Sequence, residues 1–162
     1  MKVLSVAGLA AFLAVATSAS ALPAFSPAPR TSPDTHDPAL LRGAAAGCHG
    51  TFDRFVVQAS FNAPGYDVRY VRRIVADPSG RPVSLLGATR LRVVFKLAGG
   101  HDNHGTDYLP SALTPRCPNL LQVKETGDFE GVVSFGLGLR GMTGFRVFRL
   151  QNPMRVVIDV AH

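Results

Sequence analysis

Residues 90–97 read Arg-Leu-Arg-Val-Val-Phe-Lys-Leu. In an extended chain, the apolar members share one face and the basic members share the other. The apolar set is Leu91, Val93, Phe95 and Leu97, and the basic set is Arg90, Arg92 and Lys96. Such alternation is typical of an antiparallel strand with one buried face and one solvated face. The stretch therefore predicts a β-sheet with a hydrophobic core on one side.

Short segments with similar strand-like patterns flank this stretch on both sides. The expected strands are residues 52–61, 67–76, 83–86, 120–125, 132–139, 144–150 and 154–160. Residues 77–80 and 126–128 are expected turns, because Pro, Gly, Asp and Ser favour turn conformations. No long helical pattern interrupts them. The chain is therefore predicted to be all-β, a small antiparallel β-sandwich of about seven to eight strands.

Aromatic side chains supply most of the expected core. They are Phe52, Phe55, Phe61, Tyr70, Phe95, Phe135 and Phe148.

The first 47 residues have a different composition from the rest. Residues 1–21 begin with Lys2, continue with an apolar run and end in Ala19-Ser20-Ala21, which is typical of a secretory signal peptide cleaved after Ala21. Residues 22–47 contain frequent prolines and are expected to form a flexible tether without a packed core. Residues 48–162 are expected to form the folded domain, outside the cytoplasm.

The chain is basic, with 17 Lys and Arg against 11 Asp and Glu and a formal net charge of +6. Loss of Lys2 with the signal peptide leaves +5. Such a charge fits a nucleic-acid ligand, but an exported protein meets other polyanions, among them wall polymers and lipid headgroups. We therefore expect no nucleic-acid partner and no membrane span after cleavage.

Cys48 and Cys117 are the two cysteines of the chain. An even number in an oxidising compartment favours a disulfide, and closing a loop of this length would stabilise the fold by about 4 kcal/mol. Two cysteines exclude a four-thiolate zinc site and an iron–sulfur cluster. The alternative is a nucleophilic thiol paired with His49 or His104, for which no local signature exists.

Two other groups of polar residues are weighed as sites. The segment His101-Asp102-Asn103-His104, together with Asp107 and His49, offers metal-ligand atoms. Their spacing matches no strong motif, and a solvated turn in the long loop 99–118 is favoured over a metal site. Asp128 and Glu130 flank Phe129 and are interpreted as turn and strand-end charges rather than glycosidase carboxylates. No nucleophile elbow or phosphate loop occurs. We predict no catalytic residues, no metal, no cofactor and no enzymatic activity.

Four arginines are candidate ligand-binding residues: Arg69, Arg73, Arg90 and Arg92. They lie on the expected outer faces of strands, where guanidinium groups would bind carboxylate or phosphate. The alternative is that they are solvated charges that discourage edge-to-edge aggregation.

Several motifs resemble the AMIN-like domain, a family of exported bacterial proteins. They are His49–Arg54, Pro64–Val71, Gly80–Val83, the glycine-rich run Gly127–Leu139, Phe145–Phe148 and Pro153–Val160. The run Gly127–Leu139 is the most specific, and the resemblance covers Cys48–Ala161.

This resemblance implies a non-catalytic β-sandwich of the cell envelope, because the related AMIN domain targets periplasmic amidases and secretins by binding peptidoglycan. The implied partner is peptidoglycan or an associated acidic wall polymer. The alternative is a protein-interaction module that localises or regulates an envelope protein.

Overall fold

The computed structural model describes residues 21–33 and 36–162, which form thirteen strands and no helix. No helix able to cross a membrane is therefore found in this part of the chain. The strands are β1 (Arg30–Ser32), β2 (Ala39–Cys48), β3 (Phe52–Ala59), β4 (Gly65–Val71), β5 (Ile74–Val75), β6 (Pro82–Val83), β7 (Thr89–Lys96), β8 (Ala98–Gly99), β9 (Ala112–Leu113), β10 (Leu120–Phe129), β11 (Val132–Leu139), β12 (Phe145–Leu150) and β13 (Arg155–Ala161).

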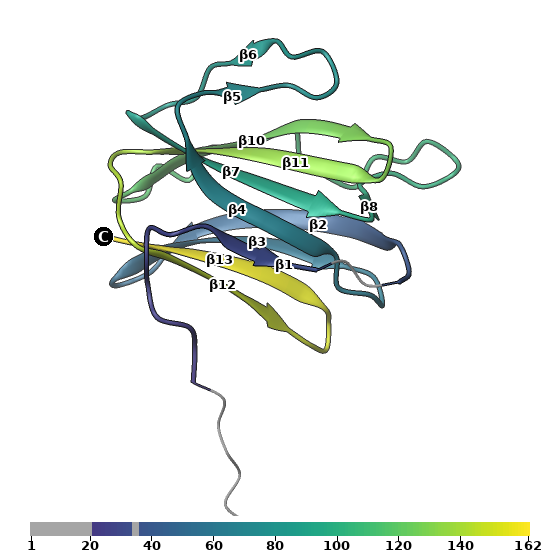
Figure 1. Ribbon diagram of the computed structural model, residues 1–162, viewed down its shortest axis with the longest axis horizontal. Coiled ribbons are helices and arrows are strands. Elements are labelled where there is room, and N and C mark those ends of the chain that lie inside the picture. The colour runs from purple at the N-terminus through teal and green to yellow at the C-terminus, as the bar shows by residue number, and fades with distance from the viewer. Residues whose placement is uncertain (1–20, 34–35) are drawn as a thin grey trace, which may run out of the picture.

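Two sheets stack face to face as a sandwich (Figure 1). The six-stranded sheet has the order β1-β4-β7-β11-β10-β9, and the five-stranded sheet has the order β12-β13-β3-β2-β8. Strands β5 and β6 form a separate hairpin over the outer face of the six-stranded sheet. The predicted all-β sandwich is confirmed, and the strand count rises because several pairings are only two residues long.

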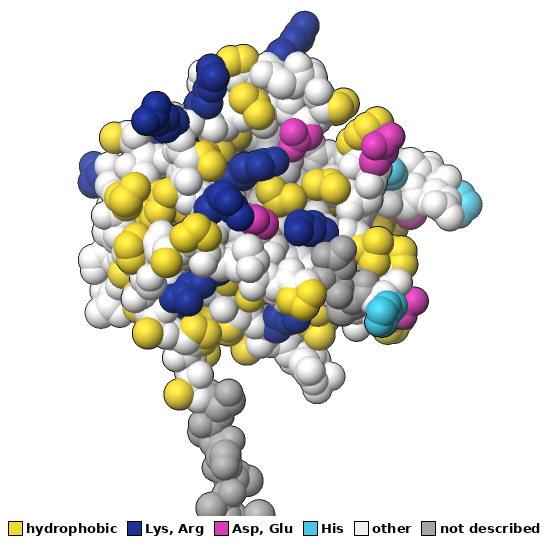
Figure 2. Space-filling view, viewed as in Figure 1, with side chains coloured by type: hydrophobic (Ala, Val, Ile, Leu, Met, Phe, Trp, Pro, Cys, Tyr) yellow, Lys and Arg dark blue, Asp and Glu magenta, His cyan; other side chains and the backbone are white. Residues whose placement is uncertain are grey.

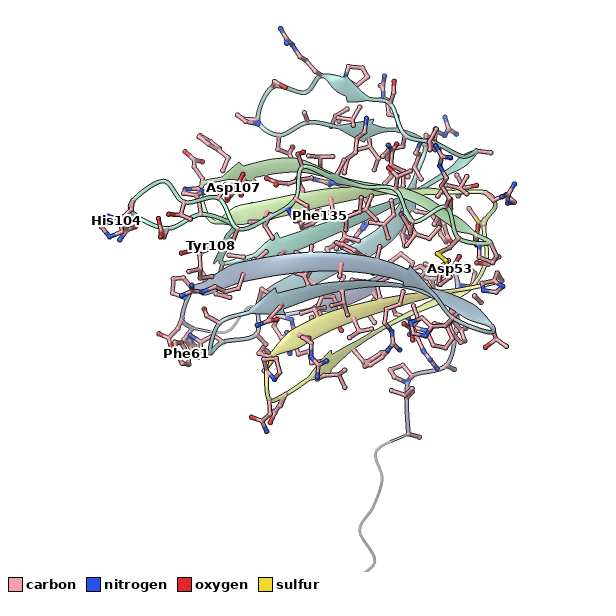
Figure 3. The ribbon with its side chains drawn as sticks, turned by 180° about the vertical axis from the view of Figure 1, so that it is seen from behind. Asp53, Phe61, His104, Asp107, Tyr108 and Phe135 are labelled. Carbon is pink, nitrogen blue, oxygen red and sulfur yellow. A yellow bond between two sulfur atoms is a disulfide. The ribbon has the colours of Figure 1, made fainter. Side chains whose placement is uncertain are left out.

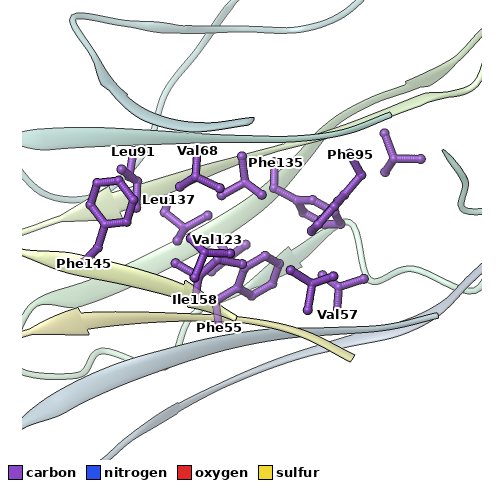
Figure 4. Close-up of a cluster of buried hydrophobic side chains, with 14 of the residues drawn as sticks. Phe55, Val57, Val68, Leu91, Phe95, Val123, Phe135, Leu137, Phe145 and Ile158 are labelled. Carbon is purple, nitrogen blue, oxygen red and sulfur yellow. The ribbon is translucent and has the colours of Figure 1, made fainter. Parts of the chain in front are cut away.

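The core lies between the two sheets and is centred on three buried phenylalanines (Figure 4). The ring of Phe135 lies 5.2 Å from that of Phe55 and 6.1 Å from that of Phe95, edge to face in both cases. Edge-to-face contacts add to the stabilisation that burial alone provides. The sequence predicted these three correctly, and Phe52, Tyr70 and Phe148 are half-buried.

The predicted burial of Phe61 is wrong, since this side chain is 96% exposed. Strand β3 ends at Ala59, so the alternation that would place Phe61 in the core stops two residues before it.

The glycines of β11 allow the β5–β6 hairpin to pack directly on the sheet. A Cβ on Gly136 would lie 2.9 Å from carbons of Ile74 and Leu85, and one on Gly138 would collide with the carbonyl oxygen of Leu86. Ile74 and Leu85 are consequently buried outside the main core. The glycine-rich run is thus a platform for a second, smaller apolar layer.

The turn predicted at residues 126–128 is wrong. Strand β10 continues to Phe129, and the chain reverses at Glu130 and Gly131, whose φ values of 48° and 76° suit a two-residue hairpin turn. Gly127 has a different role, because a Cβ there would lie 2.8 Å from Asp77 of the hairpin above it.

The tether predicted for residues 22–47 is wrong for residues 39–47, which form most of β2. Ala39 and Leu41 are 2% and 0% exposed and belong to the core. The Gly and Ala residues that follow have weak strand propensity, so pairing with β3 decides their conformation. Upstream, β1 pairs with β4. The predicted signal peptide lies outside the described residues except for Ala21.

The predicted disulfide between Cys48 and Cys117 is confirmed, and it links the end of β2 to the loop before β10. Beside it, the buried Asp53 carboxylate accepts backbone N–H bonds of 2.7 Å from Asn119 and from Leu120. Asp53 belongs to the five-stranded sheet and Leu120 to the six-stranded one. The disulfide and the carboxylate therefore join the two sheets at the same end of the sandwich.

We predict that Gly138→Ala destabilises the protein by about 1–3 kcal/mol, because the added methyl group must displace the backbone at Leu86. Gly141→Ala is the matched control, since no atom lies within 4 Å of a Cβ built there. Urea unfolding measures both. Equal stabilities for the two variants would contradict the proposed packing of the hairpin.

Candidate functional site

Arg69 and Arg92 lie side by side on the outer face of the six-stranded sheet, as register partners in β4 and β7. Each has an internal acidic neighbour. Arg69 forms two hydrogen bonds with Asp67, which raise the pKa of its guanidinium group, and Arg92 lies 3.6 Å from Asp77. Figure 2, which looks at the edges of the two stacked sheets, shows Lys and Arg side chains spread over the visible surface, with acidic side chains among them.

The other two predicted arginines do not join this pair in one pocket. Arg90 donates to the backbone carbonyls of Leu85, Gly87 and Thr89 at 2.7–3.1 Å, so it anchors the segment that returns from the hairpin. Arg73 is exposed just before β5. A ligand-binding role for all four residues stays a prediction.

A second arginine cluster lies on the outer face of the five-stranded sheet. Asp159 is fully buried and pairs with Arg54 at 2.7 Å and with Arg146 at 2.8 Å. The two guanidinium groups lie over the rings of Phe25, Phe52 and Phe148, 4.4–5.7 Å from their centroids. These contacts hold the N-terminal segment against the sheet and leave little guanidinium surface for a ligand.

The predicted solvated turn at residues 101–107 is a structured loop at the end of the sandwich opposite the disulfide (Figure 3). The Asp128 carboxylate accepts bonds from the Gly100 N–H at 2.9 Å and from His101 Nδ1 at 2.5 Å. The bond to Asp128 raises the pKa of His101. Asp102 accepts bonds from the backbone N–H of Thr106 and the hydroxyl of Tyr108, which lower its pKa.

The structure does not bring three of these side chains within reach of a single ion. Among the described residues, the one group of three potential ligands within reach of a single ion is Cys48, Asp53 and Cys117, and its two sulfur atoms are bonded to each other. His101 instead serves as a partner of Asp128, and His104 lies at the tip of the loop, away from the sheets (Figure 3).

Glu125 lies at this end of the sandwich, and its pKa is strongly shifted. Burial raises the pKa of Glu125 to about 7, and the negative charges of Asp107 and Asp128 act in the same direction. It occupies the position in β10 opposite Phe135. Its ionised form is therefore disfavoured in the folded state.

A pH dependence of stability follows from this shift. Between pH 4.5, the ordinary pKa of the glutamate, and about 7, the folded state holds a proton that the unfolded state has lost. Glu125 therefore lowers the unfolding free energy as pH rises through this window. We predict that Glu125→Gln gains stability relative to the wild type as pH increases, whereas the exposed turn variant Glu130→Gln does not. Parallel urea-unfolding profiles for wild type and Glu125→Gln would contradict this assignment.

A hollow of about 670 Å³ opens at the same end, on the five-stranded sheet. Its lining comes from β2, the end of β3 and the β12–β13 turn. The residues of this end hollow are Arg42, Gln58, Ala59, Ser60, Phe61, Gln151, Asn152, Pro153 and Met154.

Several polar groups of the end hollow are available to a ligand. The side-chain amides of Gln58, Gln151 and Asn152 form no hydrogen bond with any residue that the structure describes. The Arg42 guanidinium lies over the Tyr108 ring, 4.9 Å from its centroid, and has no carboxylate within ion-pair distance in the described chain. Phe61 stands almost fully exposed beside them (Figure 3).

Sequence reasoning missed the end hollow because its two halves are far apart in the chain. Gln58–Phe61 and Gln151–Met154 meet only through the pairing of β3 with β13. Arg42 was also missed, because it lies in the segment predicted to be a flexible tether.

The family model for the AMIN-like domain matches residues 39–162. The chain belongs to the AMIN-like family. The match starts at the first residue of β2. No curated protein and no solved structure matches the chain.

Membership in the AMIN-like family suggests a non-catalytic module. Together, the family and the Cys48–Cys117 disulfide indicate an extracytoplasmic protein, since such bonds persist in oxidising compartments.

Proposed function

We propose that this AMIN-like domain is a non-catalytic module that binds peptidoglycan or an associated acidic wall polymer and thereby stays at the cell wall. The end hollow is the binding site in this proposal. The signal peptide predicted for residues 1–21 provides the route of export.

The chemistry of the end hollow fits an acidic glycan that carries acetamido groups. A sugar ring can stack its C–H face on the exposed ring of Phe61, and the amides of Gln58, Gln151 and Asn152 can bond to hydroxyl and acetamido groups. Few but well-placed polar groups beside an apolar surface are typical of small-ligand sites. Arg42 can pair with a carboxylate of the polymer.

The observation that carries the proposal is the presence of an exposed aromatic ring, unbonded amides and an unpaired guanidinium in one hollow. In contrast, Arg69 and Arg54 have internal carboxylate partners in Asp67 and Asp159. A ligand carboxylate can bind Arg42 without displacing a protein carboxylate.

The surface around Arg69 and Arg92 is the competing site, because the sequence analysis assigns ligand binding to it. Its guanidinium groups remain partly exposed, with 46% and 41% of their side-chain surfaces accessible. A wall polymer could bind there through charge alone.

Retention on purified sacculi at physiological salt tests both sites, since this salt screens exposed charges beyond about 8 Å. We predict that Phe61→Ala weakens retention about tenfold, as truncation of a central aromatic contact commonly costs more than 1 kcal/mol. Gln58→Ala combined with Asn152→Ala should act in the same direction.

Met142→Ala is the matched control, because Met142 is an exposed apolar side chain, 63% accessible, that does not line the end hollow. Retention lost in Arg69→Ala/Arg92→Ala but kept in Phe61→Ala would move the site to the arginine surface. No retention of the wild type would reject wall binding.

One feature favours the alternative function, a protein-interaction module of the envelope. Strand β2 presents a free edge, which is the kind of surface that accepts a strand from another protein.

A further inference from the structure

Strand β2 leaves most of one edge without a partner. It pairs with β3 from Leu41 to Cys48, but on its other side β8 reaches only Ala39 and Leu40. From Leu41 onward, no other segment of residues 21–33 or 36–162 pairs with this second side. Figure 3 shows β2 in the foreground, with no strand in front of it.

The hairpin that joins β2 to β3 tells which backbone groups face outward. The His49 N–H donates to the Phe52 carbonyl at 2.9 Å, so this pair is hydrogen-bonded across the turn. In an antiparallel ladder, bonded and non-bonded pairs alternate. Gly43, Ala45 and Gly47 therefore bond to β3, whereas the N–H and C=O groups of Ala44, Ala46 and Cys48 point away from it.

Residues 43–47 of this edge lack the features that usually protect an edge strand. Native edge strands are shielded by charged residues, prolines or bulges. Residues 43–47 are Gly-Ala-Ala-Ala-Gly, with no charge and no proline. The irregularity in the β2–β3 register lies between Leu41 and Gly43, before this segment begins.

Two hollows run along β2 on the outer face of its sheet, where Gly43, Ala45 and Gly47 contribute almost no side chain. One, of about 210 Å³, is lined by Gly43, Ala44, Ala45, Val56 and Gln58. The other, of about 290 Å³, is lined by Ala45, Ala46, Gly47, His49, Arg54, Val56, Leu150 and Arg155. We call these two hollows the β2 trough. A strand added beside β2 can extend long side chains across its glycines into the trough, as aromatic side chains do at edge glycines.

The composition of the trough decides which occupant fits. Residues 43–47 of a second copy would offer only hydrogen atoms and methyl groups, so they would leave the trough empty. The trough walls are apolar at Val56 and Leu150 and basic at Arg155, and no Asp or Glu lines either hollow. Arg54 also lines the trough, but its charge is paired with the buried Asp159.

We propose that the free edge of β2 accepts an extended segment of another protein as an added strand, with apolar and acidic side chains of that segment lying in the β2 trough. Backbone bonds to Ala44, Ala46 and Cys48 provide the pairing. Val56 and Leu150 receive the apolar side chain, and Arg155 receives the acidic one. This inference does not depend on wall binding, because Ala44, Ala46 and Cys48 do not line the end hollow.

An NMR titration with a defined probe tests the proposal. The probe is a short peptide with blocked termini. Every second residue is threonine, and the residues between the threonines are glutamate, leucine and glutamate, in that order. We expect the amide hydrogens of Ala44, Ala46 and Cys48 to exchange with water at least about tenfold more slowly when the peptide is bound. A lysine-for-glutamate peptide should bind about tenfold more weakly, because like charges face each other across the interface. A version N-methylated on the edge facing β2 should not bind.

Substitutions at two positions of the protein test the backbone pairing at the edge and the side-chain binding in the trough separately. Ala46→Pro removes an outward N–H, which is tolerated at a sheet edge, and should abolish binding while a thermal melt shows that the fold persists. Ala45→Glu places a negative charge at the trough and should weaken binding about tenfold, an effect of like-charge repulsion, whereas the matched Ala45→Gln should not. None of these variants should alter retention on sacculi.

Three outcomes would overturn the proposal. The first is equal binding of the N-methylated peptide. The second is protection confined to other strands, such as β9 or β12. The third is self-association of the protein that Ala46→Pro abolishes, which would assign the edge to a second copy.

Discussion

The buried carboxylate of Asp53 is the contact on which the arrangement of the two sheets depends. It lies in β3 and accepts the N–H groups of Asn119 and Leu120, where β10 begins. His162 Nε2 lies 3.3 Å from its other oxygen. An ionised group removed from water is costly unless such bonds compensate for it, so β3 and β10 keep this pairing, which the Cys48–Cys117 disulfide reinforces.

The candidate binding groups lie at the opposite end of the sandwich. There the loop around His101 closes over Asp128 and Glu125, and the end hollow opens beside Phe61. The end fixed by Asp53 also determines the path of β2, whose last residue is held by the disulfide. From Leu41 onward, β2 pairs with β3 only, so its other edge is unpaired among the described residues.

Local alternation explains what the sequence could predict. The pattern of residues 90–97 gave β7, and residues 132–139 were predicted as a strand with the bounds of β11. The disulfide and the family could also be predicted from the sequence, because both predictions depend on residue identity. The glycines of β11 belong to the motif most specific to the family. They are needed because the β5–β6 hairpin packs on them, and this contact cannot be read from a local pattern.

Contacts between distant segments explain what the sequence could not predict. Residues 39–47 become a strand because Leu41 is buried and β3 pairs with them, and this outweighs their weak intrinsic preference. The neighbours of Arg92 and Arg90 are likewise set by the fold, since Asp77 and the carbonyls of residues 85–89 reach them through the β5–β6 hairpin. The end hollow combines segments about ninety residues apart, as β3 and β13 pair across the chain.

The most direct test of this account is an NMR titration with a soluble disaccharide–peptide fragment of the wall, in which side-chain signals are followed. The account predicts that the side-chain amide signals of Gln58, Gln151 and Asn152 shift together with the ring signals of Phe61. The Nε–H signals of Arg69 and Arg92 should stay in place. Shifts confined to those two arginines, with the amides of the end hollow unchanged, would contradict the account.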